Sequence, residues 1–508
     1  MTVYLVGGGP GDPGLLTVRA LGVLERADVV VYDRLSQESL LDLAPAAAER
    51  IDVGKAPGMA RMTQDDINAL LVERGKGNAT VVRLKGGDPF VFARGGEEAA
   101  ALQAAGVPFE VIPGVTSAIA VPAYAGIPVT MRHSSTSVTI VTGHEDPGSG
   151  EEGTVDWRAV AQVGGTIVVL MGVARIGSIA RALMAGGRSA DTPVAAVQWG
   201  TRPEQRTVRA TLGTIAQQDL GTPSVIVIGD VAACELSWYE TRPLFGKRIV
   251  VTRARAQASE LVAKLQELGA DTVEVPAIEV QDPDDGGAGL RVAAGHLDAY
   301  DWVVVTSPNG ARALLDALRA LGRDPRAFGR ARIAAIGPGT AEALAAGNVL
   351  VDLVPPKFVA ESLVEVFPDP PSGLDGAARP GRILLARAAQ ARDVLPQGLA
   401  AQGWEVEVVE AYRTVAVPLE EERRADLATA DMVTFTSSST VTRFLEAAGP
   451  DAVPPAVACI GPVTAGTARE QGLRVDIEAP VHTIDGLVEA ILAWYHPTPP
   501  GGSQLTSG

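Results

Sequence analysis

The sequence is poor in the residue types that build disulfide frameworks and metal centres. It has 2 cysteines, Cys234 and Cys459, and 5 histidines among 508 residues, and none of them stands at the spacing of a metal site. Cysteines this far apart in sequence are typical of free thiols in a reducing compartment. We therefore expect a cytoplasmic protein with no metal centre.

Positive charge and long apolar runs are scarce as well. Lys and Arg number 43 against 60 Asp and Glu, which gives a formal net charge of −17. Nucleic acids and anionic membranes attract basic patches, so we expect neither as a partner. The longest uncharged run, residues 111–131, contains Pro113, Pro122 and Pro128, which disfavour a membrane-spanning helix. Met1 leads directly into an apolar run, so we also expect no signal peptide.

Apolar residues, glycine and proline are abundant instead. Apolar residues make up 46% of the chain, beside 56 glycines and 35 prolines, which supports several hydrophobic cores joined by many turns. Residues 1–240 alternate strand-like and helix-like runs, and this alternation predicts an α/β fold. The strands that we expect lie at residues 3–6, 29–32, 80–84, 109–112, 138–142, 166–170, 193–197 and 224–228.

The N-terminal stretch VYLVGGGPGDPGLLTVRA, residues 3–20, reads as strand, glycine turn and helix. Gly9 to Gly14 satisfies the pattern G-x-G-x-x-G, and Asp33 closes the next apolar run. That combination is the fingerprint of a dinucleotide-binding Rossmann domain, although the glycine pattern alone is a weak signal.

The prolines of this turn favour a different ligand. A phosphate site aims backbone N–H groups at the anion, and Pro10 and Pro13 have no N–H to donate. The turn therefore suits a nucleoside without phosphates, such as S-adenosylmethionine, better than a dinucleotide. Two further glycine-rich turns, RLKGGDPFVFARGGEE at residues 83–98 and PGVTSA at 113–118, also follow predicted strands. Three such turns predict a shared crevice at the carboxyl ends of the strands.

These turns, together with VVYDRL, VGK, AGIPVT, VTGHE, LMG and PSVIVIGDV, run in the order of the tetrapyrrole methylases over residues 1–240. Within that family the sequence resembles the uroporphyrinogen-III C-methyltransferases. The resemblance implies two αβα lobes around an S-adenosylmethionine crevice and a homodimer. It also implies methylation of uroporphyrinogen III at carbons 2 and 7 to give precorrin-2.

The resemblance also implies roles for individual residues. Asp33 matches the proposed proton acceptor and Lys55 the proposed proton donor, for a reaction in which an electron-rich pyrrole carbon attacks a methyl group. Met131 stands where the family usually has a histidine, a change that we expect to affect the porphyrinogen side of the pocket. The positions implied to line the cofactor are Pro10, Gly86, Gly87, Asp88, Val91, Thr116, Ser117, Met171 and Gly200.

Residues 248–493 contain an internal repeat. RIVVTRARA from Arg248 parallels RILLARAAQ from Arg382, and DWVVVTSPNG from Asp301 parallels DMVTFTSSST from Asp431. We expect two similar α/β lobes with parallel sheets, linked by extended runs at residues 273–280 and 406–417. Small hydroxyl residues and arginines after the strands suit an anion with several carboxylates. Those expected to bind substrate are Thr252, Arg253, Thr306, Ser307, Ser437 and Ser438.

This second half resembles the uroporphyrinogen-III synthases through TR, TSPNG, IGPGTA, EAYRT and IGPVTA. The resemblance implies cyclisation of hydroxymethylbilane with inversion of ring D, and needs no cofactor. Tyr412 matches the tyrosine proposed to help the hydroxyl group leave.

The expected domains are a methylase at 1–240, a short linker at 241–247, a synthase at 248–494 and a disordered tail at 495–508. Synthase lobe one would comprise residues 248–279 plus 414–494, and lobe two residues 282–410. The resulting hypothesis is a bifunctional enzyme of tetrapyrrole biosynthesis with tetrapyrrole substrates as its ligands. The alternative is a methylase acting on a later corrin precursor, with a C-terminal half that binds porphyrinogen without catalysis. Whether the product serves sirohaem or cobalamin stays open.

Overall fold

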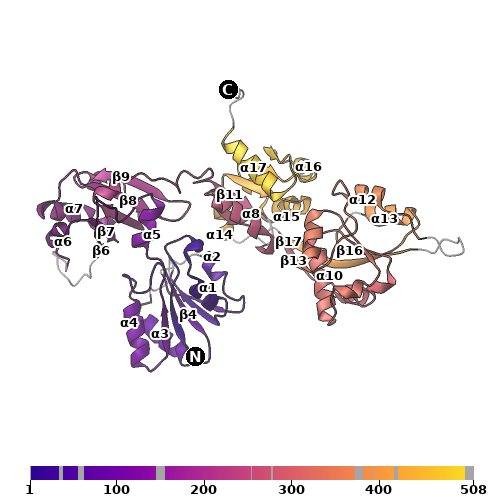
Figure 1. Ribbon diagram of the computed structural model, residues 1–508, viewed down its shortest axis with the longest axis horizontal. Helices are drawn as coiled ribbons and strands as arrows, with labels where there is room; N and C mark the ends of the chain where they lie inside the picture. The colour runs from indigo at the N-terminus through magenta and orange to yellow at the C-terminus, as the bar shows by residue number, and fades with distance from the viewer. Residues whose placement is uncertain are drawn as a thin grey trace. The chain divides into compact units, whose positions relative to one another are not determined.

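The computed structural model describes residues 2–33, 38–54, 62–144, 155–252, 255–275, 278–371, 381–391, 393–416 and 421–497. The chain forms two compact units, whose elements can be followed in Figure 1. The first comprises Met1–Arg248, Ala263–Asp271 and Tyr495–Gly508, and the second comprises Ile249–Val262 and Thr272–Trp494. The domain boundaries predicted from the sequence stay predictions. No helix in the described ranges combines the length and apolar character needed to cross a bilayer.

The first sheet is parallel, with the strand order β3-β2-β4-β1-β5. Its strands are β1 (Val3–Gly7), β2 (Val29–Tyr32), β3 (Glu49–Asp52), β4 (Val81–Lys85) and β5 (Phe109–Ile112). The central strands are nearly continuous apolar runs because helices cover both faces of the sheet. Helices α1 (Val18–Leu24) and α2 (Glu38–Leu41) pack on one face, and α3 (Gln64–Gly75) and α4 (Gly95–Ala104) on the other.

The second sheet is mixed, with the order β6-β7-β10-β8-β9. Strands β6 and β7 are parallel, whereas β10 runs antiparallel to both β7 and β8. Its strands are β6 (Val138–Thr142), β7 (Thr166–Leu170), β8 (Pro193–Gln198), β9 (Arg206–Thr211) and β10 (Ser224–Ile228). Helix α5 (Ser117–Tyr124) leaves β5 of the first sheet and packs on one face of the second. Helices α6 (Trp157–Val163) and α7 (Ile176–Ala185) cover the other face.

Residues 248–495 contain the sheets β12-β11-β18-β19-β20 and β13-β17-β16-β14-β15. The strands are β11 (Arg248–Val251), β12 (Asp271–Glu274), β13 (Ile278–Gln281), β14 (Trp302–Val305), β15 (Arg332–Ala335), β16 (Arg382–Ala388), β17 (Glu405–Ala416), β18 (Met432–Phe435), β19 (Ala456–Cys459) and β20 (Ile477–Glu478). The helices are α8 (Arg255–Glu267), α9 (Ala288–Ala294), α10 (Pro308–Ala320), α11 (Pro338–Ala346), α12 (Ala360–Val366), α13 (Val394–Ala401), α14 (Glu421–Ala428), α15 (Ser438–Ala448), α16 (Pro462–Glu470) and α17 (Ile484–Tyr495). Strand β17 pairs in parallel with β16 and antiparallel with β13.

The described residues also form short 3-10 helices. They lie at Pro13–Leu15, Val173–Arg175, Ile215–Gln217, Asp230–Ala233, Leu297–Ala299, Pro325–Phe328 and Pro450–Ala452.

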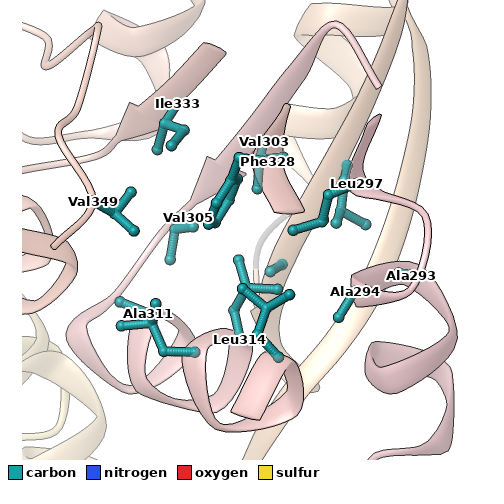
Figure 2. Packing of buried hydrophobic residues seen from close by; sticks show 14 of the residues in the cluster. Ala293, Ala294, Leu297, Val303, Val305, Ala311, Leu314, Phe328, Ile333 and Val349 are labelled. Atoms are coloured by element: carbon teal, nitrogen blue, oxygen red, sulfur yellow. The ribbon is translucent and has the colours of Figure 1, made fainter. Parts of the chain in front are cut away.

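The repeat seen in the sequence is a repeat of sheet topology. Strand β11 lies between β12 and β18, as β16 lies between β17 and β14, and β19 and β15 follow in the corresponding places. One core of the sheet β13-β17-β16-β14-β15 is shown in Figure 2, where Val303 and Val305 of β14 face Ala311 and Leu314 of α10. The α/β fold expected for both halves is therefore confirmed.

Two strands of the first unit were not anticipated. Strands β3 and β9 are the outer strands of their sheets and carry charged residues, in the sequences ERID and RTVRAT. Edge strands need little apolar surface, so the apolar pattern used to find the other strands is weak there.

Candidate functional site

The three glycine-rich turns meet at the carboxyl ends of β1, β4 and β5. The Gly8 N–H donates to the Lys85 carbonyl over 2.8 Å, and Gly9 and Gly87 exchange hydrogen bonds of 3.2 and 2.7 Å. A Cβ on Gly7 would lie 2.5 Å from the Gly114 nitrogen, and one on Gly114 would overlap the Gly87 carbonyl. Glycine is required here because the turns pack backbone against backbone.

Asp88 ties two of these turns together. Its carboxylate accepts from the Gly114 N–H over 3.1 Å and from the Phe90 N–H over 2.8 Å. Thr116 caps helix α5 and accepts from the Ala118 N–H over 3.4 Å. The positions predicted to line the cofactor on this sheet are half-buried at these turns: Pro10, Gly86, Gly87, Asp88, Val91, Thr116 and Ser117.

Four N–H groups of the first turn donate to acceptors within the protein. Besides Gly8 and Gly9, the Asp12 N–H donates to Thr201 Oγ1 over 3.0 Å and the Gly14 N–H to Asp12 Oδ1 over 2.7 Å. Prolines at positions 10 and 13 have none to give. These groups are therefore not available to a diphosphate, which separates this turn from a dinucleotide-binding loop.

Asp12 also joins the first sheet to the second. Tyr124 of α5 donates to Asp12 Oδ2 over 2.6 Å, and Thr201 follows β8 of the second sheet. The other two predicted cofactor positions follow strands of that sheet. Met171 follows β7 with a positive φ of 55° and is 51% exposed. Gly200 is packed so closely on Val121 of α5 that a Cβ would overlap that side chain.

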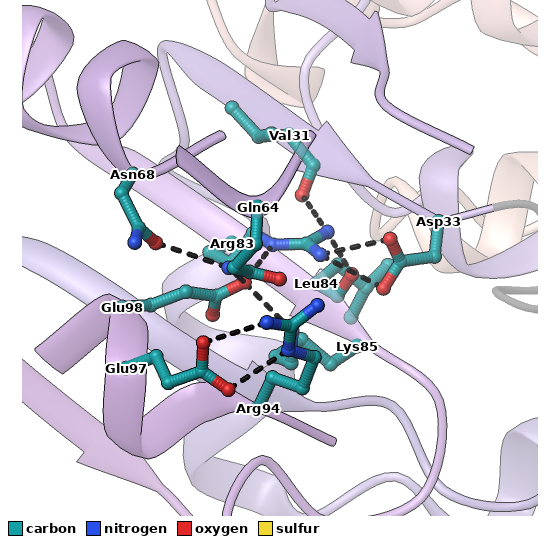
Figure 3. A network of polar contacts seen from close by, with 10 residues as sticks. All are labelled: Val31, Asp33, Gln64, Asn68, Arg83, Leu84, Lys85, Arg94, Glu97 and Glu98. Atoms are coloured by element: carbon teal, nitrogen blue, oxygen red, sulfur yellow. Dashed lines mark hydrogen bonds and ion pairs between the residues drawn. The ribbon is translucent and has the colours of Figure 1, made fainter. Parts of the chain in front are cut away.

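A buried ion network lies beside these turns, on β4 (Figure 3). The Arg83 guanidinium donates from Nη2 to both oxygens of Asp33, over 2.8 and 2.9 Å, and from Nε to Glu98 over 3.0 Å. Lys85 donates to the same Glu98 oxygen over 2.8 Å. Arg83, Lys85 and Glu98 are 2%, 3% and 0% exposed. Burial, with a contribution from the charge of Arg83, lowers the pKa of Lys85.

Asp33 differs from Glu98 in its access to solvent. The Asp33 side chain is 31% exposed, whereas that of Glu98 is wholly enclosed. Reasoning from the sequence did not single out Arg83, Lys85 and Glu98. Charged residues inside the buried run VVRLK are a signal that could have been used, since a buried charge needs a partner. Lys55 and Arg253, both predicted site residues, lie outside the described residues.

In the second unit the predicted hydroxyl residues occupy equivalent places in the two lobes. Ser307 follows β14 and caps α10, where it accepts from the Gly310 N–H over 3.0 Å. Ser437 follows β18 and caps α15, where it accepts from the Thr440 N–H over 3.3 Å. Thr306 and Ser438 are half-buried beside them. Each pair thus stands at the carboxyl end of a central strand.

Thr252 is placed differently from the rest of this group. It is 1% exposed, and its hydroxyl donates to the Thr434 carbonyl over 2.8 Å. Thr434 in turn donates to the Val250 carbonyl over 2.9 Å. These two hydroxyls join neighbouring strands, so Thr252 is omitted from the substrate contacts proposed below.

Tyr412 lies on β17, half-buried against the core of its lobe. The pairing of β16 with β17 shifts by one residue just before it, so that Ala388 faces Tyr412 after Arg387 has faced Glu410. Irregularities of this kind re-aim side chains and are common beside active sites. Among the described residues no cluster of His, Cys, Asp and Glu has the composition of a metal site.

Comparison with known proteins divides the chain in the same order. Residues 2–216 match the family Tetrapyrrole (Corrin/Porphyrin) Methylases, and residues 259–489 match Uroporphyrinogen-III synthase HemD. The chain is 37% identical over 503 residues to the porphyrin biosynthesis protein HemD of Ruminiclostridium josui, covering 96% of this chain and 97% of that protein.

Two shorter relatives match the N-terminal half. The S-adenosyl-L-methionine-dependent uroporphyrinogen III methyltransferase of Methanosarcina barkeri is 54% identical over 233 residues, covering 45% of this chain and 91% of that protein. A uroporphyrinogen-III C-methyltransferase of Bacillus subtilis is 46% identical over 245 residues, covering 47% and 95%. The chain therefore belongs to the porphyrin biosynthesis proteins that join a tetrapyrrole methylase to a HemD uroporphyrinogen-III synthase.

Proposed function

We propose that both halves of this chain are active on successive tetrapyrroles. The synthase half cyclises hydroxymethylbilane to uroporphyrinogen III with inversion of ring D. The methylase half, which is S-adenosylmethionine-dependent, methylates uroporphyrinogen III at carbons 2 and 7 to give precorrin-2. The observation that carries the methylase assignment is the N-terminal turn, in which four N–H groups donate to Lys85, Gly87, Thr201 and Asp12 and two prolines have none.

The cofactor residues are assigned at the carboxyl ends of strands in the two sheets of the first unit. We place the nucleoside against the half-buried turns that follow β1, β4 and β5, where Asp88 fixes the backbone. Met171, exposed after β7, is suited to an apolar contact with the cofactor. When bound, S-adenosylmethionine supplies an electrophilic methyl group. The residues here bind the nucleoside and hold the pyrrole carbon in line with that group.

Asp33 is assigned as the proton acceptor. Methylation of a pyrrole carbon leaves a proton to be removed, and a positioned carboxylate can accept it. Asp33 is partly exposed at the end of β2, whereas Glu98 of the same network is enclosed. The two hydrogen bonds from Arg83 fix the orientation of the Asp33 carboxylate. Lys55 stays the proposed proton donor.

Tyr412 is assigned to the synthase reaction. A phenol can donate a proton to the departing hydroxyl group of hydroxymethylbilane, and the resulting cation can then close the ring. The hydroxyl and backbone N–H groups at Thr306, Ser307, Ser437 and Ser438 would bind substrate carboxylates, with Arg253 adding charge. No cofactor is proposed for this half. We also propose a homodimer formed through the methylase half, which size measurement in solution would test.

The decisive experiment supplies the pure chain with hydroxymethylbilane and S-adenosylmethionine and identifies the pigment. Precorrin-2, with two equivalents of S-adenosylhomocysteine, is the expected result. Calorimetry should show binding of S-adenosylhomocysteine and none of NADP. The reverse binding pattern would overturn the methylase assignment.

The alternative function has its own test. If the methylase half acted on a later corrin precursor, methyl transfer would be faster with precorrin-2 than with uroporphyrinogen III. If the synthase half only bound porphyrinogen, the chain would not consume hydroxymethylbilane. Tyr412→Phe should lower that consumption, while the matched variant Tyr300→Phe, which removes a phenol hydrogen-bonded to Glu407 over 2.7 Å, should not.

A further inference from the structure

The segment that follows the second sheet packs on the end of helix α5 and the residues just after it. The Leu236 N–H donates to the Gly126 carbonyl over 3.2 Å, and Trp238 Nε1 donates to the Ala123 carbonyl over 2.9 Å. The Tyr124 ring lies 4.9 Å from that of Trp238 and 4.8 Å from that of Tyr239. We call residues 236–245 the connector. It lies beyond residue 216, where the methylase family match ends.

The connector contacts the backbone of Thr201 at two points, the carbonyl directly and the N–H through Gln205. The Tyr239 hydroxyl donates to the Thr201 carbonyl over 3.2 Å. The Thr201 N–H donates to Gln205 Oε1 over 2.8 Å, and Gln205 Nε2 donates to Glu240 over 2.8 Å. Glu240 also accepts from Thr207 over 2.6 Å. Tyr239, Gln205 and Thr201 are 5%, 4% and 1% exposed, so the bonds among them are shielded from water, whereas Glu240 and Thr207 are half-buried.

The backbone that the connector holds is strained. Trp199 and Thr201 have positive φ angles of 48° and 69°, which residues other than glycine rarely adopt. Such conformations persist only where the surroundings over-determine them, and they cluster at functional sites. Gly200, a proposed cofactor contact, lies between the two residues.

Thr201 links this strained turn to the N-terminal turn. Its Oγ1 accepts from the Asp12 N–H over 3.0 Å, and Tyr124, packed against Tyr239, donates to the Asp12 carboxylate over 2.6 Å. Burial and the Asp12 charge raise the pKa of Tyr124, and the same two causes raise the pKa of Tyr239. Both phenols therefore stay hydrogen-bond donors at physiological pH.

We propose that the connector is part of the cofactor site, with Tyr239 and Glu240 as positioning residues that act through Thr201 on the turns of Asp12 and Gly200. The inference rests on the proposed function, because it requires the cofactor to lie on those turns. It adds to the cofactor site two residues that lie beyond residue 216, where the methylase family match ends, and inside the segment 1–240 expected to form the methylase.

The test uses Tyr239→Phe and Glu240→Ala in the full chain. Tyr239→Phe keeps the ring packing and removes the hydrogen bond to Thr201. Tyr239→Phe should weaken binding of S-adenosylhomocysteine about three- to fivefold, the effect of losing one ordinary hydrogen bond. Glu240→Ala loses two and should weaken binding at least as much. The KM for S-adenosylmethionine should rise by a similar factor, while the KM for uroporphyrinogen III and the synthase activity stay unchanged. Tyr300→Phe is the control, as it likewise removes one phenol hydrogen bond, in this case to Glu407 in the second unit.

The outcomes separate the two proposals. If the unaltered chain fails to bind S-adenosylhomocysteine, the proposed function itself is wrong. If the unaltered chain binds it and Tyr239→Phe binds equally well, the connector is not part of the site. An unchanged circular dichroism spectrum and an unchanged thermal unfolding curve show that a variant is folded. Should Glu240→Ala fail that check, the Tyr239→Phe result alone decides.

Discussion

Asp33 and Glu98 are carboxylates of one network in opposite surroundings. Arg83 contacts both, but the Asp33 side chain is 31% exposed and that of Glu98 is enclosed. Asp33→Asn preserves the shape and removes the proton acceptor, so we expect the methylation kcat to fall about 10²- to 10⁴-fold. Binding of S-adenosylhomocysteine should be unchanged. Asp28→Asn, just before β2, is the control, since the Asp28 carboxylate accepts a hydrogen bond from the Thr80 N–H over 2.6 Å. Equal rates in both variants would contradict the assignment.

Glu98 has a structural role that the adjacent Glu97 lacks. Glu98→Gln removes the charge that compensates buried Arg83 and Lys85, and breaking a buried pair in this way destabilises a fold by about 3–5 kcal/mol. Glu97→Gln removes an exposed pair with Arg94 and should cost less than about 1 kcal/mol. Denaturant unfolding of the two variants measures both values. Similar losses would show that the network is not a stabilising unit.

At the scale of elements, the turns between strand and helix determine the site. Gly114→Ala would drive a Cβ into the Gly87 carbonyl and the Gly7 backbone, none of which can rotate away. We expect S-adenosylhomocysteine binding to fall about 5- to 150-fold, because forcing atoms into a packed site typically costs about 1–3 kcal/mol. Gly96→Ala in helix α4 is the control. A Cβ there meets nothing within 4 Å, so stability should hold or rise slightly. Calorimetry and thermal unfolding distinguish the two variants.

Apolar strands followed by glycine were predictable, and the strands expected at residues 138–142 and 224–228 coincide with β6 and β10. Edge strands β3 and β9 were not, because they lack that apolar pattern. Of the site, the glycine turns were predictable because glycine and proline act locally on the backbone. The contacts of Asp12 with Tyr124 and Thr201 were not, since they join residues 112 and 189 positions apart.

Two reactions are proposed for the whole molecule, and the residues assigned to them lie in different compact units. Asp33 lies in the first unit and Tyr412 in the second. Asp33→Asn should cyclise hydroxymethylbilane without methylating it, and Tyr412→Phe should methylate supplied uroporphyrinogen III without making it efficiently. Neither variant alone should form precorrin-2 from hydroxymethylbilane at the normal rate. A mixture of the two should form it, because we expect the intermediate to be released into solution and captured by the other chain. Absorbance of precorrin-2 in a coupled assay follows this directly. If the mixture stays as slow as the separate variants, while each retains its own remaining activity, the intermediate passes within one chain and free release is wrong.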